Sequence, residues 1–283
     1  MTDDILLKDL SDNILTLTLN RPKHRNALNP NLMRALLDAL NDATEDARVR
    51  CVILQGVGKD FCAGGDIAAA KDANNTTELS AEEKAAAELR AAKRGPVSAE
   101  LMTRWLRRNA EVARIIHTMP KPVISVLKGN VVGAGIGLAL ACDFRVVADT
   151  AKLTSGFVKV GYSGDFGISY FLTKNLGPAK AKEVLMLNRP IYGETLNTLG
   201  LATQYTSADE ASSCARELAI ELANSAPISL AYMKQNVRIA MEKELDISLD
   251  MESINQNRSG STNDSKEAIK AFFEKRQPVF QGT

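Results

Sequence analysis

The chain has 283 residues, enough for one large α/β domain with an appendage. It carries 35 Lys and Arg against 34 Asp and Glu, a net charge of +1, so its charge does not point to nucleic acid or a membrane as a partner. No apolar stretch approaches the roughly 18–20 residues that cross a bilayer, and the amino terminus lacks a signal-like segment. The four separated cysteines favour a reduced, cytoplasmic protein without a disulfide framework or a metal site.

The first part of the chain has the order strand, helix, strand. Residues 14–19 alternate as a half-buried strand does. Asn29 is a plausible helix cap and Pro30 suits the first helical position, so the sequence predicts a helix from there. A short apolar strand follows at 51–54. This order favours a parallel pair of strands.

The middle of the chain predicts two helices. Residues 71–95 are rich in Ala, Glu and Lys, and Ser80 with Glu83 forms a capping box, which indicates an exposed connecting helix. The alternative is a wall over a binding site. The next apolar pattern, from Leu101 to Ile116, predicts one amphipathic helix.

A second strand, helix, strand unit covers residues 123–148, with a glycine-rich turn at 129–137. Beyond residue 167 the pattern is almost entirely helical. We therefore expect an α/β core at 1–205, with a helical insert at about 71–95, and a helical C-terminal region at 206–283. The clearest helices are expected at 180–187, 209–223, 230–241 and 265–275.

Three loop segments are candidates for chemistry: 61–67, 129–137 and 161–167. Small residues in the first let the main chain approach a ligand closely. The second lies at a strand-to-helix turn, where free amides and the helix dipole stabilise negative charge on a bound oxygen. Its glycine spacing fits neither a dinucleotide fingerprint nor a P-loop, and a role in close packing remains the alternative.

The titratable residues give weaker signals. Asp165 lies in the third loop, where an aspartate commonly forms a turn or caps a helix. The only histidines are His24 and His117, and neither lies in a motif. His117 is expected near a helix end, where a cation complements the dipole. The sequence suggests neither a Ser-His-Asp arrangement nor a metal cluster.

Together these segments resemble the crotonase (enoyl-CoA hydratase/isomerase) superfamily from about Ile14 to the end of the chain. The resemblance implies an α/β fold, a spiral of ββα turns with a C-terminal helical trimerisation region, and assembly as a homotrimer or a dimer of trimers. It rests on Asn20-Arg21-Pro22 with Asn26-Ala27-Leu28, on Phe61-Cys62-Ala63-Gly64-Gly65-Asp66, on residues 121–137, and on Ala271-Phe272-Phe273-Glu274-Lys275-Arg276.

The resemblance also implies site residues, with acyl-CoA as substrate and no cofactor, since coenzyme A enters as part of the substrate. The backbone N–H groups of Gly65 and Ala134 match an oxyanion hole. The positions expected to bind CoA are Ala63, Asp66 and Ile67, together with Phe272 and Lys275, which would reach CoA from a neighbouring subunit. The acyl pocket is expected to include Trp105, Leu106, Phe157 and Tyr162.

The departures from the family pattern narrow the expected chemistry. The two glutamates of the hydratases correspond here to Gly137 and Phe157, which cannot titrate, so ordinary hydration is disfavoured. Asp165 matches an aspartate of the dienoyl-CoA and ring-1,2-epoxyphenylacetyl-CoA isomerases. The resemblance therefore predicts isomerisation of a double bond in an enoyl-CoA, or in a ring-derived acyl-CoA, with Asp165 as the proton shuttle.

Other functions remain open at this point. The stretch 161–201 is similar to 4-chlorobenzoyl-CoA dehalogenases, but the histidine and the ring-clamping tryptophan of that group correspond to Ala110 and Phe157. Carbon–carbon bond chemistry on aryl or alicyclic CoA esters, as in the naphthoate synthases, ranks next. A chain that binds CoA esters as a scaffold without catalysis is the alternative from a different class.

Overall fold

The computed structural model describes residues 4–66 and 98–283. The expected helical insert at 71–95 and the candidate residue Ile67 fall outside the described residues.

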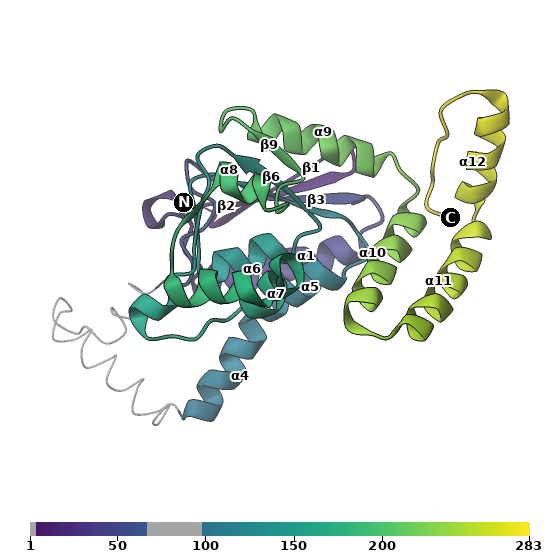
Figure 1. The fold of residues 1–283 in the computed structure, drawn as a ribbon. Helices are drawn as coiled ribbons and strands as arrows, with labels where there is room; N and C mark the ends of the chain where they lie inside the picture. The colour runs from purple at the N-terminus through teal and green to yellow at the C-terminus, as the bar shows by residue number, and fades with distance from the viewer. Residues whose placement is uncertain (1–3, 67–97) are drawn as a thin grey trace.

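A six-stranded sheet forms the centre of the core (Figure 1). Its first two strands pair antiparallel as a hairpin, and every later neighbour pairs parallel. Parallel neighbours require crossover connections, which the intervening helices supply. The strands, in spatial order, are β1 (Leu6–Ser11), β2 (Ile14–Leu19), β3 (Cys51–Gly56), β4 (Val123–Leu127), β6 (Phe144–Ala148) and β9 (Gln204–Thr206).

The first crossover confirms the strand, helix, strand order predicted from sequence. Helix α1 (Pro30–Glu45) joins β2 to β3, which pair in parallel with Ile14 opposite Cys51. The Asn29 side chain caps the helix by accepting a hydrogen bond from the Leu32 amide at 2.9 Å.

A smaller sheet lies where the functional loops meet. Its strands are β5 (Asn130–Val132), β7 (Lys152–Thr154) and β8 (Ile191–Tyr192). An isolated parallel bridge joins Cys62 to Val131 in β5. It consists of the Cys62 amide donating to the Asn130 carbonyl at 3.0 Å and the Val132 amide donating to the Cys62 carbonyl at 2.9 Å. The loop at 61–66 is therefore fixed to the strand that precedes the glycine-rich turn.

Helices cover both faces of the large sheet (Figure 1). On one face lie α1, α5 (Glu111–Thr118), α6 (Ala134–Ala141) and α7 (Ile168–Lys182), which a π-helical turn extends over Glu183–Leu187. On the other face lies α9 (Ala211–Ala223), whose buried alanines pack on β3, β4 and β6. The core thus continues past residue 205 to include α9. Short α8 (Gly193–Thr198) follows β8.

The single helix expected from Leu101 to Ile116 is two helices in the structure. Helix α4 (Ala99–Asn109) ends at Ala110, and α5 begins at Glu111 in a new direction. None of the residues of α4 is buried, whereas Val112 and Ile116 of α5 lie in the core. The prediction was wrong because apolar periodicity continues across the break although the two halves face different partners.

The C-terminal region consists of three helices at the side of the core, seen at the right of Figure 1. They are α10 (Pro227–Glu242), α11 (Leu245–Gly260) and α12 (Asn263–Glu274). Lys234 anchors α10 to the core by an ion pair with Asp143 at 2.7 Å and by donating to the carbonyls of Ile116 and Lys121. Within the described part of the chain, no helix is both long and apolar enough to cross a membrane.

Candidate active site

A pocket of about 660 Å³ brings together most of the residues that the sequence singled out. It lies between the start of α1, helix α4, the start of α6 and the loop before α7. Its lining is mainly apolar, as is usual for a small-molecule site. The expected residues that line it are Gly65, Asp66, Trp105, Leu106, Ala134, Phe157, Tyr162 and Asp165.

The backbone N–H of Gly65 takes no part in the hydrogen bonds of the bridge in which this residue lies. A parallel bridge pairs Gly65 with Leu28, but its hydrogen bonds come from the Leu28 amide to the Gly64 carbonyl and from the Asp66 amide to the Leu28 carbonyl. Among the described residues, the Gly65 N–H has no acceptor. A Cβ added at Gly65 would meet no atom of the described part of the chain within 4 Å, so these residues leave the space beside the amide open.

Ala134 supplies the second free amide. It is the first residue of α6, where the N–H has no partner within the helix. Gly133 before it has φ 53°, a left-handed conformation that turns the chain sharply from β5 into the helix. The positive end of the helix dipole adds to the field at this amide, so the position favours a negatively charged oxygen.

The two amide-bearing loops are packed directly against each other. A Cβ at Gly64 would lie 2.9 Å from the Val132 carbonyl oxygen, and one at Gly135 would lie 2.9 Å from the Cys62 Cβ. Both positions therefore require glycine. Burial raises the pKa of the Cys62 thiol to about 12, so this cysteine acts here as a small apolar packing residue.

Asp165 does not cap the helix that follows it. Helix α7 has Gly167 at its cap position and no side-chain capping bond. The Oδ1 atom of Asp165 is buried and has no hydrogen-bond partner among the described residues, while its backbone carbonyl accepts from the Ile168 amide. Burial raises the pKa of Asp165 to about 6. An unpaired carboxylate with a pKa near neutrality is suited to proton transfer.

The raised pKa makes a prediction about stability. Since the pKa of Asp165 rises from 3.8 to about 6 on folding, its charge destabilises the folded state above pH 6, and this penalty is lost below pH 3.8. The side chain is partly solvated, so we expect Asp165→Asn to add on the order of 1–2 kcal/mol to the free energy of unfolding at neutral pH. Urea denaturation near pH 8 and near pH 4 measures this. A stability difference that does not shrink at the lower pH would contradict it.

The two positions that carry glutamates in the hydratases hold no carboxylate in this pocket. Phe157 turns its side chain into the lining, and Gly137 lies in the second turn of α6. A Cβ at Gly137 would lie 2.4 Å from the Phe166 carbonyl oxygen, so any larger residue clashes with backbone there.

The expected CoA-binding residues are only partly brought together. Asp66 lines the pocket and forms an ion pair with Arg21 at 2.7 Å. Ala63 lies in the same loop, where its amide donates to the Arg25 carbonyl, but it does not line the pocket. Phe272 and Lys275 lie on or just after α12, which Figure 1 shows on the opposite side of the molecule from α4. Within one chain they do not line this pocket.

Sequence reasoning missed several lining residues. Two of them could have been found from helical spacing, because Met102 and Asn109 lie on the same face of α4 as Trp105. Phe166 directly follows Asp165 in sequence. Ser163 lies in the candidate loop 161–167, and Leu28 lies in one of the segments that carry the resemblance. Met33 and Thr103 had no local signal, since only the fold brings them here.

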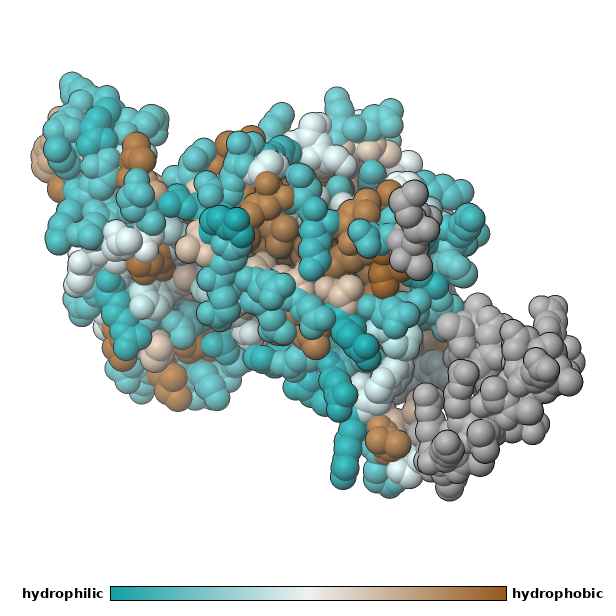
Figure 2. Space-filling model, turned by 180° about the vertical axis from the view of Figure 1, so that it is seen from behind, coloured by the Kyte–Doolittle hydropathy of each residue, from teal (hydrophilic) through white to brown (hydrophobic). Residues whose placement is uncertain are grey.

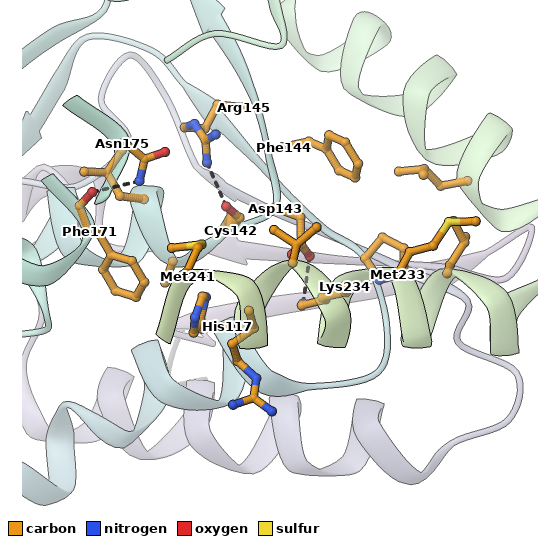
Figure 3. A pocket seen from close by; sticks show the side chains of 17 residues that line it. His117, Cys142, Asp143, Phe144, Arg145, Phe171, Asn175, Met233, Lys234 and Met241 are labelled. Carbon is orange, nitrogen blue, oxygen red and sulfur yellow. Dashed lines mark hydrogen bonds and ion pairs between the residues drawn. The ribbon is translucent and has the colours of Figure 1, made fainter. Parts of the chain in front are cut away.

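A second pocket, of about 400 Å³, lies between α10 and the core (Figure 3). Its main polar groups are engaged in structural contacts: Asp143 pairs with Lys234, Arg145 donates to the Cys142 and Leu201 carbonyls, and Asn175 donates to the Phe171 carbonyl. Burial lowers the pKa of His117, and its Nε2 atom has no hydrogen-bond partner among the described residues. This pocket lacks the free amides and unpaired carboxylate of the first.

Known proteins are similar to this chain in sequence and in fold. The family profile described as Enoyl-CoA hydratase/isomerase matches residues 9–98 and 102–283. The chain is 30% identical over 279 residues to the 1,2-epoxyphenylacetyl-CoA isomerase of Escherichia coli, covering 99% of each chain. It is 28% identical over 265 residues to the short-chain-enoyl-CoA hydratase of Clostridium acetobutylicum, covering 93% of this chain and 92% of the other.

The crystal structure of an enoyl-CoA hydratase from Polaromonas aligns with a TM-score of 0.82 at 33% identity, over 97% of this chain and 99% of that one. This similarity confirms the crotonase-like fold and the helical C-terminal region expected from sequence. Since the relatives include both hydratases and an isomerase, they do not by themselves decide between the two reactions. The chain belongs to the enoyl-CoA hydratase/isomerase family of acyl-CoA enzymes.

Proposed function

We propose that this enzyme isomerises a double bond in an enoyl-CoA, or in a ring-derived acyl-CoA, through an enolate. The observation that carries the proposal is the Asp165 carboxylate, unpaired among the described residues, in the same apolar pocket as the free amides of Gly65 and Ala134. These are the elements that an enolate mechanism needs: a base, and donors for the developing oxyanion.

In the proposed reaction the thioester oxygen accepts hydrogen bonds from both amides. Asp165 removes a proton from the α carbon, and the electrons move into the carbonyl to give a dienolate that the amides stabilise. Asp165, now protonated, returns the proton to the γ carbon, so the double bond moves and the carboxylate is regenerated. One carboxylate is sufficient because no water is added.

Hydration is the less favoured reaction for this chain. Adding water needs one group to activate the water and another to deliver a proton to carbon. Gly137 cannot accept a side chain and Phe157 has no titratable group. The carboxylates that line the pocket among the described residues are Asp165 and Asp66, and Asp66 is paired with Arg21. A dehalogenase-like reaction lacks its water-activating histidine, since Ala110 stands at that position.

A panel of substrates tests the proposal. We expect the protein to convert a 3-enoyl-CoA to the conjugated 2-enoyl-CoA, which absorbs more strongly in the ultraviolet, and to add water to a 2-enoyl-CoA far more slowly. Halide release from a chlorinated aryl-CoA would favour the dehalogenase-like alternative. Binding of these CoA esters without conversion of any of them would favour a scaffold and contradict the proposal.

We also propose that the active form is a homotrimer or a dimer of trimers acting in the cytoplasm. The C-terminal region exposes large apolar side chains, with Phe272 and Phe273 each 78% exposed. Hydrophobic side chains of this region appear in brown on the lobe at the left of Figure 2. Such exposure is characteristic of an interface. A neighbouring copy would bring Phe272 and Lys275 to the CoA, and analytical ultracentrifugation measures the assembly directly.

A further inference from the structure

Gly137 lies directly against the backbone of Phe166, the residue that follows the proposed base. A Cβ at Gly137 would lie 2.4 Å from the Phe166 carbonyl oxygen and 2.8 Å from the Phe166 Cβ. Backbone atoms cannot move aside as a flexible side-chain end can, so this contact exists only because residue 137 is glycine. It holds the loop before α7 against the second turn of α6.

Phe166 adopts a backbone conformation that a bulky residue rarely takes. Its φ is 51°, in the left-handed region, and its side chain is only 5% exposed. The flanking Gly164 and Gly167 also have positive φ, 114° and 74°. A strained residue persists only where its surroundings determine it, and here the buried ring and the contact with α6 do so.

The direction of the Asp165 carboxylate depends on this loop. Its Oδ1 has no hydrogen-bond partner among the described residues, and the side chain makes no capping bond to α7. No donor among the described residues holds the carboxylate, so its position depends on where the backbone of residues 164–167 places the Asp165 Cβ. That backbone is fixed on one side by the contact of Phe166 with Gly137.

We propose that Gly137 and Phe166 are positioning residues: their contact holds the loop that carries Asp165, so that in this chain a side chain added at position 137 displaces the base. This inference rests on the proposed role of Asp165. Glycine at position 137 then does more than leave out an acid. A glutamate placed there would displace Asp165 instead of adding a second carboxylate.

The test compares Gly137→Ala with Gly260→Ala, using a 3-enoyl-CoA as the probe. Both glycines are helical, but a Cβ at Gly260 meets nothing within 4 Å. We expect Gly137→Ala to lower kcat by about 100-fold with KM changed less than about threefold, since a misplaced base costs turnover more than binding. The pH at which kcat falls on the acidic side should also differ between Gly137→Ala and the parent protein. Gly260→Ala should match the parent in each respect.

A second variant keeps the test decisive if Gly137→Ala does not fold. Phe166→Ala removes the buried ring and should lower kcat by about tenfold or more, with the same shift in the pH profile. Because this ring also lines the pocket, KM is expected to rise as well, and the positioning effect is measured by kcat. Parental kcat and pH profile in either folded variant would overturn the inference. If Asp165→Asn is inactive while those variants remain fully active, the positioning role fails and the proposed function stands; if Asp165→Asn is fully active, the proposed function fails first.

Discussion

Asp165→Asn is expected to lose about 10²–10⁴-fold in kcat on a 3-enoyl-CoA, the usual contribution of a positioned general base. The amide has nearly the shape of the carboxylate but cannot take the α proton. The affinity for a non-reacting CoA ester should stay within about threefold of the parent, because the change leaves the oxyanion donors and the apolar lining in place. Steady-state kinetics and calorimetric titration give the two quantities.

A matched control separates this effect from loss of one negative charge. Asp42 lies exposed on α1, outside the pocket lining, and Asp42→Asn should leave kcat and KM unchanged. The same Asp165→Asn protein should be more stable than the parent at neutral pH, so its inactivity cannot be attributed to unfolding. Turnover of Asp165→Asn equal to that of Asp42→Asn would exclude the carboxylate from the chemical step.

Ala134→Pro is expected to abolish one oxyanion donor while retaining the helix. Ala134 is the first residue of α6, a position that proline occupies readily because its N–H has no helical partner. The ring replaces the N–H with carbon and fills part of the space in which the thioester oxygen would lie. The loss should be about 3–4 kcal/mol of transition-state stabilisation, or about 10²–10³ in kcat/KM.

The control for this change is Ala99→Pro, at the first position of α4 after the capping residue Ser98. It makes the same substitution at an equivalent helical position, and residue 99 does not line the pocket. Circular dichroism should show both variants folded, with only Ala134→Pro impaired. If folded Ala134→Pro keeps the parental kcat/KM, the Ala134 amide does not act as an oxyanion donor.

The sequence predicted those parts of the fold that depend on neighbouring residues. Asn29 caps α1 as expected, because the capping bond spans only three residues. The parallel pairing of β2 with β3 followed from the strand, helix, strand order. The positions of Gly65, Ala134 and Asp165 in one pocket came from the family resemblance, since no spacing along the chain brings three separate loops together.

Other features depend on contacts distant in sequence and had no local signal. The break at Ala110 arises because α4 borders the pocket while α5 packs in the core, and the apolar spacing is similar on both sides. Asp165 alone would be read as a capping residue, and only the structure shows that it caps nothing. The need for glycine at position 137 is visible only when Phe166, 29 residues later, lies against it.

Deuterium uptake tests the enolate mechanism most directly. The protein is incubated in heavy water with a 3-enoyl-CoA, and NMR follows the label at the α and γ carbons. We predict that the parent protein introduces deuterium at these carbons and that Asp165→Asn and Ala134→Pro each slow the uptake by about 100-fold or more. Uptake at the parental rate in either variant would contradict an enolate held by these amides and formed by Asp165. So would a parent protein that binds the ester but neither takes up deuterium nor transfers the α hydrogen to the γ carbon.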